Sequence, residues 1–133
     1  MFDSIDLAIA ALSDENLSER QREEAARYLE KDASPAAIEA LIAALRDRDA
    51  GVRYVVSQSL ADLGEKAIKP LLLALTRPDA DLFFFESARP VFINNSSERV
   101  KIRSKALVAA THKIGATVVV MEEANKLLLS DWS

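Results

Sequence analysis

The sequence predicts an all-α fold built from a repeated unit, and three observations support this. A nonapeptide occurs twice, as AIEALIAAL at 37–45 and as AIKPLLLAL at 67–75, so the two copies lie thirty residues apart. Self-similarity at a period of 20–50 residues is typical of repeat arrays. Half of the 133 residues are apolar but only 6% are aromatic, with three glycines and four prolines, which is a helical composition. Apolar residues also recur at helical spacing in successive segments.

Short helices separated by turns are predicted over the first third of the chain. Apolar residues at positions 5, 8, 9 and 12 share one face of a helix over 3–12. The stretch SERQ at 18–21 is a capping box, and it begins a helix that extends to about Lys31. Ser34 caps the next helix, over 35–46, with Pro35 at the first helical position, where its missing N–H costs nothing.

The second nonapeptide lies in a predicted helix over 66–76, after a helix over 51–63 that Gly64 ends. A third repeat begins on schedule, and then the pattern fails. The aromatic stretch at 82–85 starts like a helix, but Pro90 stops it and residues 91–93 are β-prone. Residues 82–97 are therefore predicted to form an irregular insertion, followed by helices from Ser97 to about Ile114 and over 117–130.

Three motifs carry a resemblance to a known family. They read DAGVR at 49–53, LADLG at 60–64 and AIKPLLLAL at 67–75. In this order they resemble HEAT repeats, particularly the short subclass named after the phycobilisome lyases. The resemblance implies antiparallel helix pairs stacked into a right-handed α-α superhelix of about seven to eight helices. First helices would line the convex side and second helices the concave side.

The resemblance also implies a division of the chain and roles for some residues. A single HEAT-like repeat domain would span 1–133, with a partial repeat over roughly 1–16, repeats over 17–47 and 48–77, and a third over 78–130 with the insertion 82–97. In such repeats the aspartate of the turn and the following arginine pair between neighbours, so Arg53 would contact Asp47, Asp49 or Asp79. The structural residues predicted are Asp49, Arg53, Gly64 and Asp79.

The sequence contains no recognisable catalytic constellation. Cysteine is absent, which excludes disulfides, thiolate metal sites and thiol catalysis. The single histidine, His112, lies opposite the apolar face of its helix, and we interpret it as an ordinary exposed side chain. We therefore expect no enzyme activity, no metal and no cofactor.

Charge and hydropathy narrow the classes of partner. Residues 1–49 carry a net charge of −6 and residues 50–133 carry +2. Within the basic stretch 89–113, a run of four basic residues covers a wide helical arc: Arg99, Lys101, Arg103 and Lys105. We interpret this run first as a solvated face, second as a contact for an acidic protein, and last as a contact for nucleic acid. No apolar run reaches membrane length, and the first residues are acidic where a signal peptide is basic. We expect a cytoplasmic protein without a membrane partner.

Two sets of residues are candidates for binding a protein partner. The first is the aromatic stretch with a nearby arginine: Phe83, Phe84, Phe85, Arg89 and Phe92. Three consecutive phenylalanines on a helix span about 200°, so they cannot all face one core. Two interpretations stay open: most of these rings are buried locally, or one or two stay exposed for a partner or for self-association. The second set is Glu39, Lys69 and Leu73, of which the first two occupy the same outward position one repeat apart.

The leading functional hypothesis is a non-catalytic protein–protein interaction scaffold or adaptor. It follows from the repeats, the absence of a catalytic pattern and the aromatic stretch. The subclass name supplies the alternative, a bilin lyase subunit or a phycobiliprotein chaperone-like protein. Homodimerisation through the insertion is compatible with both.

Overall fold

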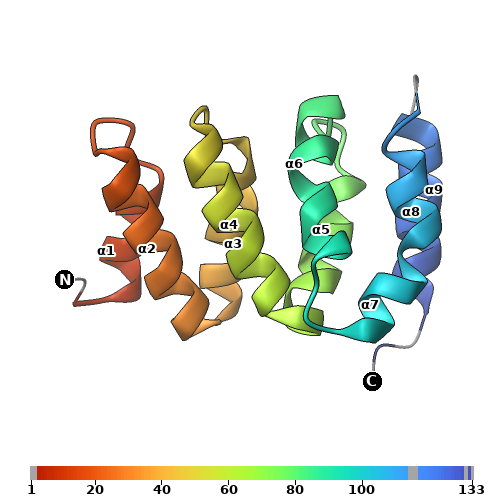
Figure 1. Cartoon of the computed structure of the whole chain (residues 1–133), viewed down its shortest axis with the longest axis horizontal. Helices are drawn as coiled ribbons and strands as arrows, with labels where there is room; N and C mark the ends of the chain where they lie inside the picture. The colour runs from red at the N-terminus through yellow and green to blue at the C-terminus, as the bar shows by residue number, and fades with distance from the viewer. Residues whose placement is uncertain (1–2, 114–116, 131, 133) are drawn as a thin grey trace.

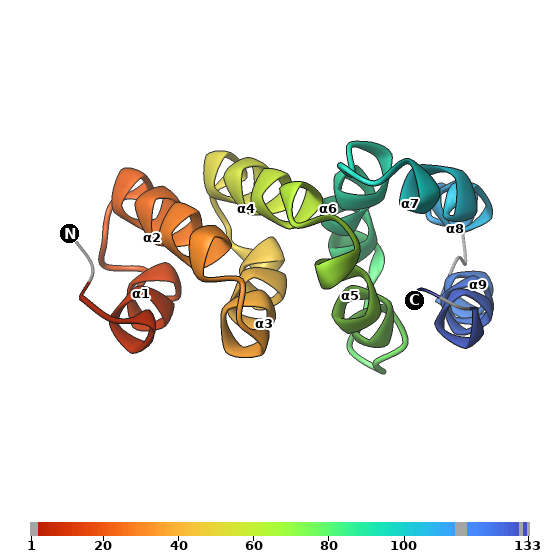
Figure 2. The ribbon, with the colours of Figure 1, turned by 90° about the horizontal axis from the view of Figure 1, so that it is seen from below.

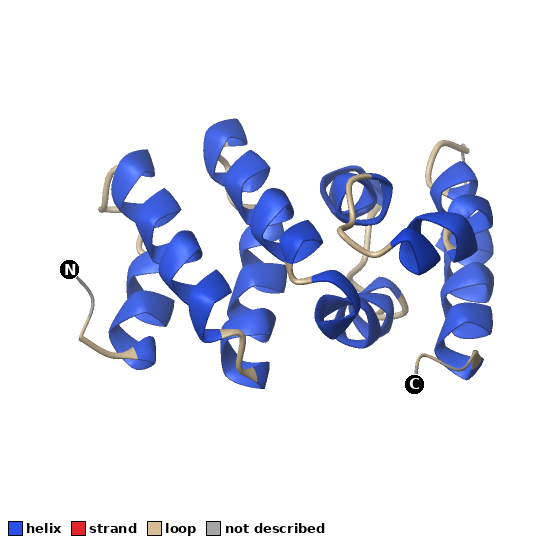
Figure 3. Cartoon of the chain, turned by 60° about the horizontal axis from the view of Figure 1, so that its bottom comes forward, coloured by secondary structure: helices blue, strands red, loops and turns tan. Residues whose placement is uncertain are grey.

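The computed structural model describes residues 3–113, 117–130 and 132, and over these residues the chain is helical without a strand (Figure 3). Its α-helices are α1 (Ile5–Leu12), α2 (Glu19–Asp32), α3 (Pro35–Ala43), α4 (Ala50–Asp62), α5 (Ile68–Leu75), α6 (Leu82–Ile93), α7 (Glu98–Arg103), α8 (Lys105–Ala110) and α9 (Thr117–Leu129). Two 3-10 segments accompany them: η1 (Ala44–Arg46) follows α3, and η2 (Gly64–Ala67) precedes α5. In this described part no helix is long and apolar enough to cross a bilayer.

The helices lie in two layers (Figures 1 and 2). The first layer holds α2, α4, α6 and the α7–α8 segment, and the second layer holds α1, α3, α5 and α9. Neighbours within a layer pack together, as α2 does with α4, α4 with α6, α3 with α5, and α5 with α9. Contacts of α1 with α2 and of α8 with α9 join the two layers at the ends of the stack.

Side chains cap most of the helices at the positions that the local sequence indicates. Ser18 accepts a hydrogen bond from the backbone N–H of Gln21, whose side chain accepts one from the N–H of Ser18, so the predicted capping box is confirmed. Ser34 caps α3 with Pro35 at its first position, which is also confirmed. Ser4, Asp49, Asp81 and Ser97 cap α1, α4, α6 and α7 in the same way.

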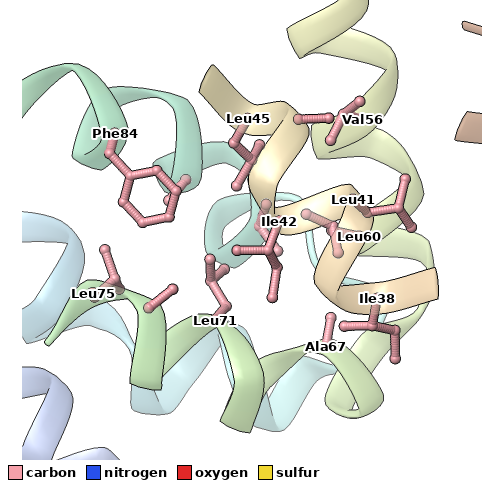
Figure 4. Close-up of a cluster of buried hydrophobic side chains, with 14 of the residues drawn as sticks. Ile38, Leu41, Ile42, Leu45, Val56, Leu60, Ala67, Leu71, Leu75 and Phe84 are labelled. Atoms are coloured by element: carbon pink, nitrogen blue, oxygen red, sulfur yellow. The ribbon is translucent and has the colours of Figure 1, made fainter. Parts of the chain in front are cut away.

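The two nonapeptides form the middle of the hydrophobic core (Figure 4). Leu41 and Leu45 of the first copy and Leu71 and Leu75 of the second are fully buried. Ile38 and Ile42, with their equivalents Ile68 and Leu72, are at most 4% exposed. The prediction that these positions point inward is confirmed, and the equivalent helices α3 and α5 pack against each other in the second layer.

Most of the segment predicted to be an irregular insertion, 82–97, is instead a helix. The helix α6 begins after the cap at Asp81 and continues through Pro90 to Ile93. Proline inside a helix lacks an N–H and crowds the carbonyl four residues before it. Here Val91 and Phe92 are almost completely buried, and this burial favours a helix that continues past the proline. The prediction that 91–93 is β-prone was therefore wrong.

The single helix predicted from Ser97 to about Ile114 is two helices in the structure. It is interrupted at Ser104, whose φ of −91° and ψ of 3° depart from helical values. The hydroxyl of Ser104 is buried without a hydrogen-bond partner. α8 ends at Ala110, and the predicted helix end at Ile114 lies outside the described residues.

The loop that follows α6 is tied to the end of α4. Asn95 is fully buried, and its side-chain amide donates to the carbonyl of Val91 over 3.1 Å. The backbone N–H of Ser96 donates to the carbonyl of Ala61 over 3.0 Å, and its hydroxyl donates to that of Asp62. Gly64 lies in this contact with a left-handed φ of +63°. A Cβ there would lie 2.9 Å from the Oγ of Ser96.

Gly64→Ala is expected to lower the free energy of unfolding by about 1–2 kcal/mol. The added Cβ makes the left-handed conformation costly and also crowds Ser96. Urea denaturation of the variant and the parent measures the loss.

Ala33→Gly is the matched control, because Ala33 also has a left-handed φ, of 56°, at the end of α2. Here the substitution relieves backbone strain, but glycine loses more conformational entropy on folding than alanine does. The net result is expected to be a rise in the free energy of unfolding of up to about 1 kcal/mol. A shift in the same direction for both variants would contradict the explanation.

Candidate protein-binding surfaces

A groove lies between α4 and α6 on the solvent side of the first layer, and we call it the outer groove. Its volume is about 250 Å³. It is lined by Ala50, Arg53, Tyr54, Ser57, Phe83, Glu86, Ser87 and Pro90. Both helices therefore contribute aromatic and charged side chains to one surface.

The outer groove exposes two aromatic rings beside a cation that is held in place. Tyr54 is 64% exposed and Phe83 is 42% exposed. The guanidinium of Arg53 lies 5.0 Å from the ring centre of Phe83 and donates to the carbonyl of Asp47 over 2.8 Å. Tyrosine, phenylalanine and arginine are enriched in protein interfaces, and rings whose neighbours are already ordered lose little entropy on binding.

The outer groove also offers hydrogen-bond acceptors. Pro90 has no N–H, so the carbonyl of Glu86 lacks the donor that a helix normally supplies four residues later. The Glu86 side chain is exposed at the same place, and Ser87 is half-buried beside it. A partner segment with an N–H or a basic group can therefore bind here through hydrogen bonds.

The other phenylalanines of α6 are buried, which corrects their assignment as candidate partner contacts. Phe84, Phe85 and Phe92 are 3%, 1% and 2% exposed. Phe84 also lies under the guanidinium of Arg46, 4.7 Å from it. Of the two interpretations left open, most rings are buried, but Phe83 stays exposed because three consecutive residues cannot share one helix face.

Arg89 is likewise tied to the protein itself. Its Nε donates to the hydroxyl of Thr111 over 2.9 Å, and its Nη2 donates to the carbonyl of Thr111 over 3.1 Å. Arg89 therefore anchors α6 to the end of α8 rather than presenting its charge to a partner.

The remaining candidates lie together on the exposed face of α3 and α5. Glu39, Lys69 and Leu73 are all exposed there, Leu73 to 54%. Glu39 pairs with Arg77 over 3.5 Å. Both side chains of this pair are about half exposed, so it contributes on the order of 0–1 kcal/mol.

A second groove lies beside this face, between α1 and α3, and we call it the α1–α3 groove. Its volume is about 260 Å³. Its lining is largely apolar, with charged residues at one end: Ile9, Leu12, Ser13, Glu15, Ala40, Ala43, Ala44, Arg46 and Asp47. Small alanines on α3 leave the space that this groove occupies.

The main ion pair between neighbouring helices is one that sequence reasoning missed. Arg22 of α2 is 3% exposed and donates to Asp47 through Nε over 3.0 Å and through Nη2 over 3.2 Å. The hydrogen bond to Asp47 raises the pKa of Arg22 above its ordinary value. The sequence does contain one signal that Arg22 is buried. Position 22 lies on the same face of α2 as the buried residues Ala25, Ala26 and Leu29.

Two of the predicted structural residues, Asp49 and Arg53, lie beside this pair. Arg53 contacts Asp47 through the backbone carbonyl, whereas Asp49 caps α4 and donates its own N–H to the Asp47 carboxylate over 2.8 Å. The carbonyl of Asp79 accepts from Arg46 over 2.8 Å, so a similar arginine contact occurs one repeat later.

The basic stretch near α7 is used within the fold. Arg99 pairs with Glu65, and Ser97 donates to the same carboxylate over 2.7 Å. These hydrogen bonds, from Arg99 first, lower the pKa of Glu65. Arg99 and Arg103 also lie against the ring of Trp132. His112 is exposed, and the described residues contain no group of three or more His, Cys, Asp or Glu that could hold a metal ion.

Two layers of short helices with a repeated core motif define the class of helical-repeat proteins. Comparison with protein families gives a match to HEAT repeats over residues 4–83, which is 80 of the 133 residues. The chain belongs to the HEAT-repeat family. The match ends at Phe83, near the start of α6. No curated protein and no solved structure shows a significant match.

Proposed function

We propose that the protein is a non-catalytic interaction module that holds a segment of a protein partner in the outer groove. HEAT repeats commonly mediate protein–protein interactions. The observation that carries the proposal is the pair of exposed rings, Tyr54 and Phe83, beside an arginine whose position is fixed by two contacts. In this proposal the helix pairs form a right-handed superhelix, and the outer groove lies on its convex side.

The groove favours a partner segment with an apolar side chain next to a hydrogen-bond donor. The apolar group would lie between Tyr54 and Phe83, and the donor would reach the carbonyl of Glu86. A few aromatic residues usually dominate such an interface, each costing about 2 kcal/mol or more when truncated. A scaffold or adaptor function follows from this kind of binding.

Site-specific photocrosslinking tests the proposal. With a benzoylphenylalanine at position 83, we expect one discrete adduct with a partner protein in extracts of the source cells. Adding Tyr54→Ala to this variant is expected to reduce the adduct about tenfold or more. The matched control carries the same crosslinker at Arg20, whose side chain is 88% exposed on the first layer but far along the chain from the groove. Equal adducts from both positions, or none from position 83, would overturn the proposal.

The alternative, a bilin lyase subunit or phycobiliprotein chaperone, rests on the subclass resemblance. The outer groove and the α1–α3 groove have volumes of about 250 and 260 Å³, below the range of about 300–1,000 Å³ of most small-molecule sites. We therefore rank it second. An absorbance change on incubation with bilin and apoprotein would reverse this order.

A further inference from the structure

The exposed face of α3 and α5 combines opposite charges with a protruding apolar side chain. The helix α3 presents Ala36, Glu39 and Ala43, and α5 with the preceding turn presents Lys66, Lys69 and Leu73. The three pairs of positions are equivalent, because each pair is thirty residues apart. Within this face, therefore, an acid on one helix corresponds to a base on its neighbour.

The flanking elements also carry exposed charges. Asp6 of α1 and Glu15 of the following turn are exposed on the α3 side of the face, and Arg77 is exposed on the α5 side. Arg46 lies at the end of η1, but it is occupied by the carbonyl of Asp79, the carboxylate of Asp81 and the ring of Phe84. Glu15 pairs with Arg48 over 3.9 Å and Glu39 with Arg77 over 3.5 Å, whereas Lys66 and Lys69 give the α5 side of the face an exposed basic edge. Within the face itself, α3 carries the acid, and α5 with the preceding turn carries the bases.

We propose that a second copy of this chain binds to this face in a symmetric dimer. Two faces that meet around a two-fold axis require the axis to lie in the plane of contact. An axis parallel to the helices, between α3 and α5, places α3 of each copy opposite α5 of the other. Glu39 then meets Lys69 of the second copy. An axis across the helices would place α3 opposite α3 and oppose like charges, so the charge pattern selects the first arrangement.

The apolar features of the face fit the same axis. Leu73 is 54% exposed, and its equivalent position on α3 is Ala43, which lines the α1–α3 groove. The axis that brings Glu39 to Lys69 therefore also brings Leu73 to the wall of that groove in the second copy. The groove is lined largely by apolar residues and has a volume of about 260 Å³, enough to receive a leucine side chain. Symmetry makes each of these contacts twice.

Charge-reversal variants at positions 39 and 69, measured by sedimentation equilibrium, test the proposed dimer. The parent chain is expected to show a concentration-dependent increase toward twice its 14.6 kDa mass at about 100 µM. Glu39→Lys and Lys69→Glu should each weaken self-association at least tenfold, because each places like charges opposite one another. An equimolar mixture of the two variants should recover the dimer, since positions 39 and 69 are then both basic in one chain and both acidic in the other. The double variant should recover it as well.

Two further variants complete the test. Leu73→Asp should weaken both the parent dimer and the mixed dimer, whereas Arg20→Glu, a charge reversal at a position that is 88% exposed on the first layer, should change neither. A monomeric parent at all concentrations, or variants that dimerise like the parent, would overturn the proposal. So would a mixture that stays monomeric. The photocrosslinking from position 83 uses the opposite layer, so failure of the dimer leaves the proposed partner site unaffected.

Discussion

Arg22→Met is expected to lower the free energy of unfolding by about 3–5 kcal/mol. The substitution keeps a long apolar side chain but removes the cation of a buried ion pair, which leaves the Asp47 carboxylate without its partner. The two side chains are only 4% and 11% exposed, so water cannot take over the role of the guanidinium. The carbonyl of Leu17 also loses the donor that Arg22 supplies through Nη1 over 2.6 Å.

The geometry explains why lysine would not rescue this position. Nε and Nη2 donate to the two oxygens of Asp47 as a fork, and Nη1 points away from them toward Leu17. A single ammonium cannot make this planar set of hydrogen bonds, so Arg22→Lys should lose most of the same stability. The pair thus fixes α2 against the turn before α4, the two helices that pack most closely along the first layer.

Urea denaturation measures this loss against a control on the same helix. Arg20→Met makes the same chemical change two residues earlier, where the side chain is 88% exposed and pairs with Glu24, so it should stay within about 0.5 kcal/mol of the parent. Combining Arg22→Met with Asp47→Leu removes both charges and should recover much of the loss. A loss for Arg22→Met no larger than that for Arg20→Met would contradict the prediction.

The parts of the fold that the sequence predicted well depend on short-range signals. Ser18 with Gln21, and Ser34 with Pro35, specify helix starts within three residues, and both were confirmed. The nonapeptides specify a buried face through spacing alone, and their leucines at positions 41, 45, 71 and 75 are fully buried. The HEAT-repeat resemblance was confirmed over residues 4–83, whereas its lyase subclass and the superhelical geometry stay predictions.

The errors occur where contacts far apart in the chain override local preference. Pro90 favours a helix end, but Val91 and Phe92 gain more from burial than the missing hydrogen bond costs. Asn95 resembles an exposed turn residue, yet it is fully buried because its loop closes on the end of α4. Arg22 looks solvent-facing by residue type, and only its register with the inward stripe indicates otherwise.

The candidate surface was predicted only in part, for a similar reason. Phe83 was among the residues proposed, but nothing local decides which of three consecutive phenylalanines faces outward. Which ring faces outward depends on where α6 begins, which the Asp81 cap sets, and on which side of α6 packs against α4. Tyr54 completes the groove from a helix about thirty residues earlier, so its role could not be inferred before the two helices were placed side by side.

Phe85→Ala is expected to lower the free energy of unfolding by about 3–5 kcal/mol. Phe85 is 1% exposed in the core, so the substitution removes a large buried ring and leaves a cavity that the surrounding helices fill only partly. Phe83→Ala, two residues away, provides the control, because its ring is 42% exposed and adds only a cation–π contact with Arg53. The control should cost less than about 1.5 kcal/mol.

The comparison of these two variants tests directly whether residues 82–97 belong to the core. If they formed a peripheral insertion with its own small cluster, truncating Phe85 would unfold that segment locally and leave global unfolding unchanged. A core helix predicts instead that Phe85→Ala shifts the whole unfolding transition, measured at the same midpoint by far-UV circular dichroism and by the fluorescence of the single Trp132. Trp132 lies with α7 and α9 beyond α6. A common shift of both signals would show that α6 couples the unfolding of the two halves of the stack. Separate transitions would contradict the assignment of α6 to the core.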